Sequence, residues 1–316
     1  MVDIIGKRYW FFGLSILVIL AGVVGYFVHG GFNLDIQFEG GSIISLQMED
    51  GNFDTAKAEE EVSKAINKKV TAQKSETAAS EGKEKIHMLV LNVAEKKQSL
   101  SSEELSKVVD TVNKNFTIKK DTQPEIRNVS PFIGEELLRS ALWSVFIVSI
   151  LIILYIWFRF RTMSGGPSAG VFGVVGLIHD ALVMISVYAI FNIPVNESFI
   201  AAILTILGYS MNDTIVIYDR IRENSRLSRK TPIAELANAS IIQTLRRTIN
   251  TTVTVLISVI TVYAFAAYYN IESVKVFTLP LIVGMVSGCY SSIFIATPLW
   301  VMWKQREAKK PTVSKA

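Results

Sequence analysis

Residues 198–224 read SFIAAILTILGYSMNDTIVIYDRIREN, an apolar run that leads into a cluster of charged residues. The apolar part, 198–218, is long enough to cross a membrane as a helix, because about 20 helical residues span a hydrocarbon layer of ~30 Å. Asp213 lies within this part. An ionisable side chain near the centre of a bilayer costs at least ~2.5 kcal/mol and usually has a role or a partner. The stretch therefore predicts a membrane helix that carries a functional carboxylate.

The whole chain has the composition of a membrane protein. Half of its 316 residues are hydrophobic and only 19% are charged, whereas roughly a quarter are charged in soluble domains. We therefore predict a polytopic α-helical membrane protein with six transmembrane helices. The other five apolar runs of spanning length are 9–28, 139–158, 167–191, 248–269 and 276–303.

Basic residues are distributed unevenly among the segments that join these runs. They are frequent in 159–161, 219–230 and the tail 304–316, whereas 191–197 has none and 268–275 has one. Because short cytoplasmic segments carry an excess of Lys and Arg, we predict that both termini lie in the cytoplasm. The first run is too long for a signal peptide and no small-residue cleavage site follows it, so we expect a retained anchor. The predicted parts are 1–28, an extracytoplasmic domain at 29–133, helices two to six at 134–303, and the basic cytoplasmic tail 304–316.

The segment 29–133 has the pattern of a water-facing α+β domain. It holds 14 Lys and Arg against 17 Asp and Glu, a net charge near −3, while the rest of the chain is near +7. Ser101 or Ser102 is a suitable N-cap for its second predicted helix. The resulting order βαββαβ predicts a ferredoxin-like extracytoplasmic domain between the first two membrane helices. Strands are predicted at 42–48, 69–75, 85–93 and 124–131, and helices at 54–66 and 99–116.

Several functional classes lack support in the sequence. Cys289 is the only cysteine, and the three histidines, His29, His87 and His179, are scattered along the chain. The sequence has no nucleophile elbow, no HExxH motif and no glycine loop that could hold a phosphate. We therefore expect no enzymatic activity, no cofactor, no metal site and no nucleic-acid partner.

Polar residues inside the predicted membrane helices indicate where function resides. On a helical wheel, Asp213 lies opposite an apolar face, so we expect it to point into the bundle or a water-filled cavity. Arg247, near the start of the fifth predicted helix, should reach a similar depth and pair with Asp213. Two interpretations stay open, a titrating site and a static ion pair that joins two helices. The apolar face comprises Leu204, Leu207, Met211, Ile215 and Tyr218, and a polar stripe on the fifth helix comprises Arg247, Asn250, Thr251, Thr254, Ser258 and Thr261.

Other intramembrane polar residues are candidates for either a relay or packing. His179 and Asp180 are adjacent, and adjacent helical residues point about 100° apart, so we do not expect them to face each other. Gly284 and Gly288 form a small-xxx-small element, which favours close helix packing. The relay or packing candidates are Asp180, Asn212, Thr214 and Thr251.

Three motifs resemble those of the SecD/SecF family of bacterial protein-export subunits, which is related to the RND transporters. GYSMNDTIVIYDRIREN, residues 208–224, is similar to the family's signature, and IIQTLRRTINTT, 241–252, is similar to its segment entering the fifth helix. DIQFEGG, 35–41, resembles the family's GIDFTGG element. Asp35, Gln37 and Glu39 depart from that element, and Arg246 stands where Ser is usual.

The resemblance implies a SecF-type subunit that pairs with SecD beside the SecYEG channel in the bacterial cytoplasmic (inner) membrane. Such a complex uses the proton or sodium motive force to assist preprotein export after SecA has acted. Its further contacts would be YajC, YidC, the unfolded preprotein and the lipid bilayer. The resemblance assigns the ion pathway to Asp213 and Arg247. It assigns structural roles to Phe38, Gly40, Gly41, Gly208, Asp219, Arg220, Arg222, Glu223 and Asn224.

Two alternatives remain open at this point. One is half of an RND-type exporter of small molecules or lipids, and the other is a scaffold subunit that transports nothing. An exporter should carry large porter domains, and a loop of 29–133 is too short for them.

Overall fold

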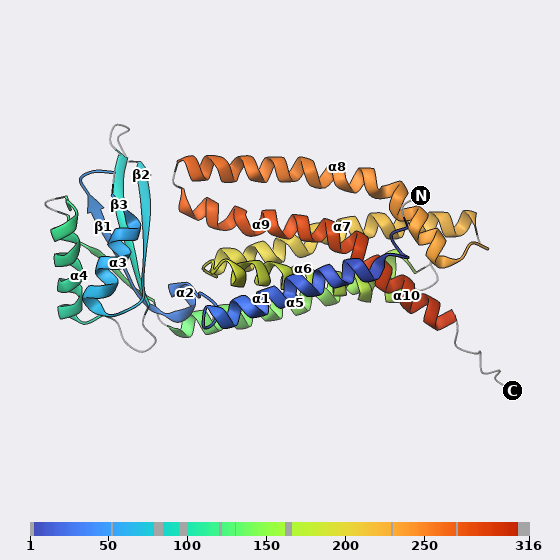
Figure 1. Ribbon diagram of the computed structural model, residues 1–316, viewed down its shortest axis with the longest axis horizontal. Helices are drawn as coiled ribbons and strands as arrows, with labels where there is room; N and C mark the ends of the chain where they lie inside the picture. The colour runs from blue at the N-terminus through green and yellow to red at the C-terminus, as the bar shows by residue number, and fades with distance from the viewer. Residues whose placement is uncertain are drawn as a thin grey trace.

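The computed structural model places a small α+β domain at one end of a long bundle of helices (Figure 1). It describes residues 3–51, 53–78, 85–94, 100–119, 122–129, 131–161, 166–228, 230–269 and 271–308. The predicted loop at 76–84 and the basic tail beyond Ala308 lie largely outside these residues.

Within the described residues, six helices are long and apolar enough to cross a membrane, in agreement with the predicted number. Most of the surface of α1 and α5 is exposed apolar side chains, whereas α6, α7 and α9 form the buried centre of the bundle. The bounds are α1 Arg8–Val28, α5 Pro131–Arg159, α6 Gly166–Ile190, α7 Glu197–Leu227, α8 Ile233–Tyr268 and α9 Glu272–Ser291. The last helix continues through a π-helical turn, η1 (Ser292–Ala296), into α10 (Thr297–Ala308).

α7 and α8 extend well beyond their apolar runs at their polar ends. α7 continues beyond residue 218 to Leu227, and α8 begins at Ile233, well before residue 248. Both extensions lie at the end of the bundle that is far from the α+β domain (Figure 1). Hydropathy marks only the part of a helix that suits lipid, so the sequence analysis missed these polar extensions.

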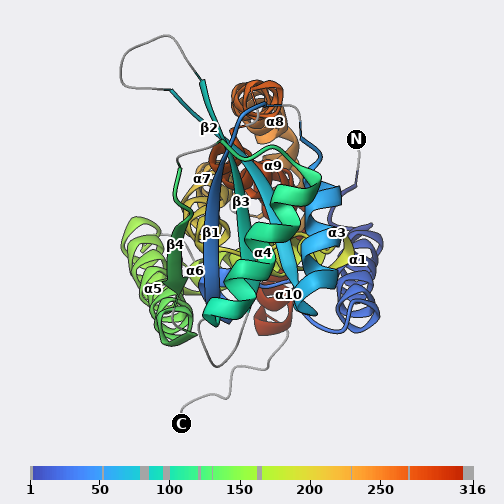
Figure 2. The same ribbon diagram turned by 90° about the vertical axis from the view of Figure 1, so that its left-hand side faces the viewer.

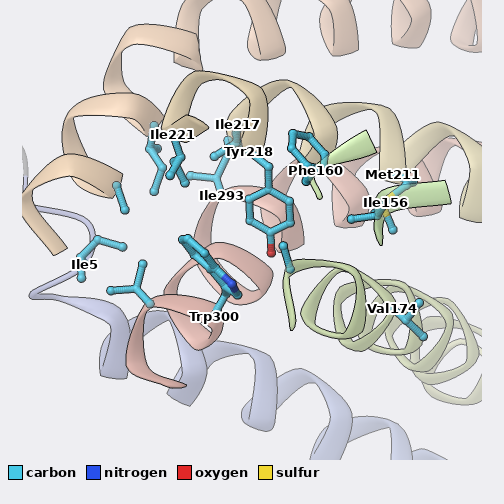
Figure 3. Close-up of a cluster of buried hydrophobic side chains, with 14 of the residues drawn as sticks. Ile5, Ile156, Phe160, Val174, Met211, Ile217, Tyr218, Ile221, Ile293 and Trp300 are labelled. Carbon is cyan, nitrogen blue, oxygen red and sulfur yellow. The ribbon is translucent and has the colours of Figure 1, made fainter. Parts of the chain in front are cut away.

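Aromatic side chains fill the core at that same end of the bundle. Tyr218 and Trp300 are 0% and 1% exposed, and their ring centroids are 5.5 Å apart. Phe160, the residue after α5, packs edge-on against Tyr218 with the ring centroids 6.2 Å apart (Figure 3). The apolar face of α7 that was expected opposite Asp213 is therefore buried in the bundle. Because Asp213 is also buried, α7 has protein on both sides.

The α+β domain has the predicted order of elements. Its four strands form one sheet in the order β2-β3-β1-β4, and the three neighbouring pairs are antiparallel. This is the ferredoxin-like βαββαβ arrangement. The helices α3 and α4 cover the face of the sheet that points away from the bundle (Figure 2). The bounds are β1 Gly41–Met48, α3 Thr55–Ile66, β2 Val70–Ala78, β3 Lys85–Ala94, α4 Ser102–Asn115 and β4 Glu125–Val129.

Local interactions explain the helix start that the sequence predicted. The Ser101 hydroxyl accepts a hydrogen bond from the Glu104 backbone N–H, and the Glu104 carboxylate accepts one from the Ser101 N–H. This capping box satisfies two backbone donors that the first turn of a helix leaves free. The Lys68 ammonium, 2.6 Å from Glu104, and the cap together lower the pKa of that carboxyl group.

A short segment joins the α+β domain to the membrane helices, and we call residues 33–39 the docking segment. The Asp35 N–H donates to the Val195 carbonyl at 2.9 Å, and the Val195 N–H donates to the Asn33 carbonyl at 2.8 Å. The Gln37 side chain accepts a hydrogen bond from the Glu197 N–H at the start of α7. Two of the three residues that depart from the family motif thus attach the domain to the turn between α6 and α7.

The docking segment lies between two glycine pairs. It includes α2 (Ile36–Glu39), which the sequence analysis did not predict. Gly40 and Gly41 follow at φ 78° and 140°, and Gly30 and Gly31 precede it at φ 73° and 133°. Residues other than glycine rarely adopt this region. The structural role that the resemblance assigns to Gly40 and Gly41 agrees with these angles.

We predict that residues 42–130, made without the membrane helices, fold as a soluble monomer. The sheet and its two helices enclose their own core, in which Leu46, Leu89 and Leu91 are at most 1% exposed. Circular dichroism should show mixed helix and strand, and sedimentation should give one monomeric species.

Leu91→Ala tests whether that core is the one seen in the structure. Deleting a buried leucine side chain should lower the free energy of unfolding by about 2–5 kcal/mol. Lys107→Ala, on the exposed side of α4, is the matched control and should change it by less than about 0.5 kcal/mol. A random-coil spectrum for the unmodified fragment would show that it is not an independent domain.

Candidate functional site

Asp213 is buried in the middle of α7 without full hydrogen bonding. Its side chain is 3% exposed, and among the residues that the structure describes its Oδ2 atom has no hydrogen-bond partner. Thr248 and Thr252 of α8 and Tyr209 of α7 also present buried hydroxyl oxygens without a partner. Asp213 and Tyr209 both lie beside Thr252. We call these four residues the α7–α8 polar cluster.

The α7–α8 polar cluster is unusual because buried polar atoms in proteins are nearly always hydrogen-bonded. A carboxylate and three hydroxyl groups are oxygen ligands, the type that protons, water and hard cations such as Na⁺ prefer. The arrangement is chemically suited to bind and release a small cation.

Arg247 lies at the exposed side of α8 near the cluster. No ion pair of 4.0 Å or less joins Arg247 to Asp213 among the described residues, so the close pair expected from the sequence is absent. Arg247 is still near enough to interact electrostatically with Asp213. Its guanidinium group lines a cavity instead.

That cavity has a volume of about 630 Å³ and lies between α7 and α8. It runs from Val216, one turn after Asp213, towards Arg226 near the end of α7. Most of its lining residues are polar or charged, and it extends from one turn beyond Asp213 to the charged end of the bundle. The remaining lining residues are Asp219, Arg220, Arg222, Glu223, Gln243, Thr244 and Arg247.

Part of the charged motif at the end of α7 joins this helix to α5. Asp219 forms ion pairs of 2.6 Å with Arg159 of α5 and 2.7 Å with Arg222. Arg222 also donates to the Arg159 carbonyl and lies over the Phe160 ring. Since these side chains are about one-third exposed, the pairs contribute little stability individually, and their role is to set the helix geometry.

The neighbouring residues of the motif attach α7 to α8. Arg220 donates to Gln243 at 2.5 Å and pairs with Glu223 at 2.6 Å. The Asn224 amide donates to the Ser240 hydroxyl at 2.8 Å and to Gln243 at 2.9 Å. These contacts support a structural role for this charged end of the motif.

Asp180 is a second buried carboxylate, with a contrasting environment. It is 0% exposed and accepts hydrogen bonds from the hydroxyl groups of Ser210 at 2.6 Å, Ser287 at 2.7 Å and Ser291 at 2.9 Å. These donors come from α7 and α9. Asp180 therefore acts as a hydrogen-bonded junction between α6, α7 and α9, which favours packing over a relay.

The expectation that His179 and Asp180 do not face each other is wrong. His179 Nδ1 lies 3.3 Å from Asp180 Oδ1, and Nε2 lies 2.9 Å from the Ser15 hydroxyl of α1. Backbone direction separates adjacent helical residues by 100°, but side-chain torsions bring the imidazole back to its neighbour.

The other relay or packing candidates lie in three different environments. Thr214 is buried and hydrogen-bonded to Ser292 of η1 at 2.8 Å, so it packs against the π-helical turn. Thr251 donates to the Arg247 carbonyl within its own helix. Asn212 is exposed on the outer face of α7, away from the buried side chains of the bundle.

The polar stripe predicted for the fifth membrane helix faces outward. Asn250, Thr254, Ser258 and Thr261 of α8 are exposed, and Thr251 is half-buried. The inward stripe consists of Thr244, Thr248 and Thr252, which recur every four residues. That spacing was visible in the sequence, but two polar stripes on one helix do not reveal which one faces the bundle.

The glycines of the motifs permit close helix approach. A Cβ atom at Gly288 would lie 2.8 Å from the Ser210 Cβ, and one at Gly284 would lie 2.5 Å from Ile206. The small-xxx-small element thus packs against α7. Gly208 differs, because it is exposed and no atom lies within 4 Å of the position a Cβ would take.

Comparison with known proteins agrees with this architecture. Residues 108–306 match the family model described as protein export membrane protein SecD/SecF, C-terminal. The chain is 34% identical to the protein translocase subunit SecF of Alicyclobacillus acidocaldarius, covering 98% of this chain and 95% of that protein. It is 35% identical to the protein translocase subunit SecDF of Bacillus subtilis, covering 98% of this chain and 39% of that protein.

A solved structure shows the same fold. The crystal structure of SecDF from Thermus thermophilus, described as a translocon-associated membrane protein, superposes with a TM-score of 0.72 at 30% identity. The match covers 96% of this chain and 39% of that one. The family match, the relatives above 30% identity along nearly the whole chain and the six membrane helices show that this polytopic membrane protein belongs to the SecD/SecF family of protein-export membrane proteins.

Proposed function

We propose that this chain is a SecF-type accessory subunit that helps move preproteins across the bacterial cytoplasmic membrane, with ion flow at Asp213 as its energy source. The single observation that carries the proposal is the buried, incompletely bonded Asp213, one turn from Val216 at the inner end of the α7–α8 cavity. The relatives, which are translocase subunits by name, support the export role.

The electrical energy available is sufficient for such a role. Moving one elementary charge across 100 mV releases ~2.3 kcal/mol. That amount can shift a two-state equilibrium nearly fiftyfold, provided that the cation binds one state better than the other. The α7–α8 polar cluster would supply this difference in affinity if it bound a proton or a sodium ion more tightly in one of the two states.

α7 offers a direct mechanical connection from the ion site to the α+β domain. It is one continuous helix from Glu197 to Leu227, and Asp213 lies near its midpoint. Its first turn is bonded to Gln37 of the docking segment. A displacement of α7 on cation binding would therefore reach the domain through residues 33–39.

The orientation in the membrane follows from the distribution of charge. The charged ends of α5 and α7 lie at the same end of the bundle as the start of α1 and the end of α10, opposite the α+β domain (Figure 1). By the positive-inside rule, that end faces the cytoplasm. The domain at 29–133 is then extracytoplasmic, where it meets the emerging preprotein.

A SecD-type partner fits the exposed polar surface of α7 and α8. Asn212 and Gly208 of α7 and Asn250 of α8 are exposed on membrane helices, and an open glycine permits close approach of another helix. SecDF relatives contain about two and a half times the length matched here, which supports pairing with a second half. SecYEG, SecA, YajC and YidC would join the same assembly.

We predict that the chain purifies from native membranes as a complex with a SecD-type protein. Exposed amides on α7 and α8 need partners in a lipid environment. Mild detergent extraction followed by affinity capture and mass spectrometry should show the two proteins in stoichiometric amounts. Capture of this chain alone as a monomer would contradict the pairing.

Asp213→Asn should abolish gradient-stimulated export while the complex still assembles. Asparagine keeps the size and much of the hydrogen bonding but cannot bind and release a proton. Export of a preprotein into inverted vesicles should fall to the level seen without a gradient. The yield of detergent-extracted complex should stay unchanged.

A scaffold predicts a different result for the same variant. If Asp213 only holds α7 against α8, its replacement should weaken this packing and lower the yield of assembled complex, and any loss of export should follow that loss of assembly. Asp180→Asn is the matched control, because it alters the other buried carboxylate. Full gradient-stimulated export by Asp213→Asn would make Asp213 a structural residue.

Arg247→Met should reduce gradient-stimulated export, whereas Arg247→Lys should retain more of it. The methionine removes the positive charge that acts on Asp213, and lysine keeps that charge in a different geometry. Export with and without a gradient is the measurement. Equal export by both variants would show that the charge of Arg247 is not needed.

A further inference from the structure

The turn that precedes α1, residues 3–7, is held within the bundle although it is not part of a helix. Ile4 and Ile5 are 4% and 2% exposed. Both belong to the buried cluster that includes Ile221 of α7 and Trp300 of α10, and Figure 3 shows Ile5 within it. The burial of two large apolar side chains fixes the turn against these helices.

The backbone of this turn is bonded to α8. The side-chain Oδ1 atom of Asn238 accepts hydrogen bonds from the Ile4 N–H at 2.8 Å and from the Ile5 N–H at 3.4 Å. Asn238 lies in the second turn of α8, which begins at Ile233. A single side chain therefore joins the start of α8 to the segment that leads into α1.

Local bonds hold the turn in the shape that this contact needs. The Asp3 carboxylate accepts a hydrogen bond from the Gly6 N–H at 2.8 Å, and the Arg8 guanidinium donates to the Ile5 carbonyl at 3.1 Å. Glycine suits position 6, because a Cβ atom there would collide with the Asp3 carboxylate. The turn is fixed by its own bonds, so it presents two neighbouring N–H groups to the one acceptor on Asn238.

α1 connects the turn to the centre of the bundle. The Ser15 hydroxyl lies 2.9 Å from His179 Nε2, and a Cβ atom at Gly25 would lie 2.8 Å from the Ala189 carbonyl oxygen. Both contacts are with α6, which also carries Asp180, the junction between α6, α7 and α9. The turn is therefore anchored, through α1, to the helices that Asp180 holds together.

α8 needs such an anchor because the bundle holds it mainly by its first half. Seven of its eight buried residues lie between Leu236 and Thr252, and the other is Ala266. Thr252, a member of the α7–α8 polar cluster, follows Asn238 by 14 residues. On a helix this spacing is about 21 Å along the axis and about 40° around it, so the two residues lie on similar sides. A shift of α8 at Asn238 would therefore move Thr252.

We propose that the turn 3–7 and Asn238 form a clamp that sets the position of α8, and that Asn238 is thereby a positioning residue for the α7–α8 polar cluster. The clamp keeps Thr248 and Thr252 opposite Asp213, where a cation that enters the cluster meets its oxygen ligands. The effect on export rests on the proposed function of Asp213, whereas the position of α8 can be measured without export.

The labelling rate of Cys289 tests the clamp in the assembled complex. Cys289, the only cysteine of the chain, is half-buried on α9 beside Thr252. Asn238→Ala removes the acceptor, so α8 should separate from α9 more often. N-ethylmaleimide should then react with Cys289 about five- to tenfold faster, the factor expected when the hydrogen bonds of one side chain are lost. Mass spectrometry of the peptide that carries Cys289 gives the rate in inverted vesicles.

Two matched variants separate the hydrogen bonds from other effects. Asn238→Asp keeps an oxygen acceptor on a side chain of the same size, so it should restore the labelling rate of the unmodified chain. Glu235→Gln, an exposed change one turn earlier in α8, should also leave that rate unchanged. Export with and without a gradient is measured in the same vesicles. Its gradient-stimulated part should fall for Asn238→Ala and be retained by both matched variants.

Three outcomes would overturn the inference. Labelling of Asn238→Ala at the unmodified rate would show that the clamp does not set the position of α8. Equally fast labelling of Asn238→Asp and Asn238→Ala would show that the hydrogen bonds are not its basis. Faster labelling of Asn238→Ala with full gradient-stimulated export would show that the cluster works without the clamp. If the gradient stimulates no export even in the unmodified complex, the proposed function fails, and the labelling rates still decide whether the clamp positions α8.

Discussion

The need to compensate buried polar groups is the constraint on which the membrane part of this structure depends. A carboxylate removed from water is stabilised only by hydrogen bonds or by opposite charge. Asp180 meets this need with three serine hydroxyls from two neighbouring helices. Asp213 does not, since one oxygen has no partner among the described residues. The two carboxylates thus differ in their surroundings. Asp180 is a structural junction, whereas Asp213 keeps an oxygen atom that can still accept a hydrogen bond or bind a cation.

α7 is where these two environments meet. Its Ser210 donates to Asp180, and its Thr214 bonds to Ser292, so one side is held firmly against α6, α9 and η1. Asp213, on the other side, faces the hydroxyls of α8. A π-helical turn places Ser292 at this contact, and such turns are frequent at functional sites. A change at Asp213 would therefore act between α7 and α8, because the opposite side of α7 is already fixed.

The elements predicted correctly from the sequence depend on local patterns. The six apolar runs, the βαββαβ order and the Ser101 cap each follow from hydropathy, periodicity or a few adjacent residues. The features that were missed depend on which side of a helix faces the protein interior, or on contacts between residues far apart in the chain. Thr248 and Thr252 form one of two polar stripes on α8, and only packing shows which stripe is inside. The contact of Gln37 with Glu197 joins residues far apart in the chain, and no local pattern predicts it.

The outer stripe of α8 bears on the pairing with a second membrane subunit that the SecDF relatives support. The hydroxyls of Thr254, Ser258 and Thr261 donate to carbonyls of their own helix, so they can lie against lipid at little cost. The side-chain amide of asparagine has two N–H donors and an oxygen acceptor, so hydrogen bonds within its own helix do not satisfy all of them. Asn250 of α8 and Asn212 of α7 are exposed and make no side-chain hydrogen bond among the described residues. These two amides, beside the open Gly208, are the groups that another membrane helix must satisfy.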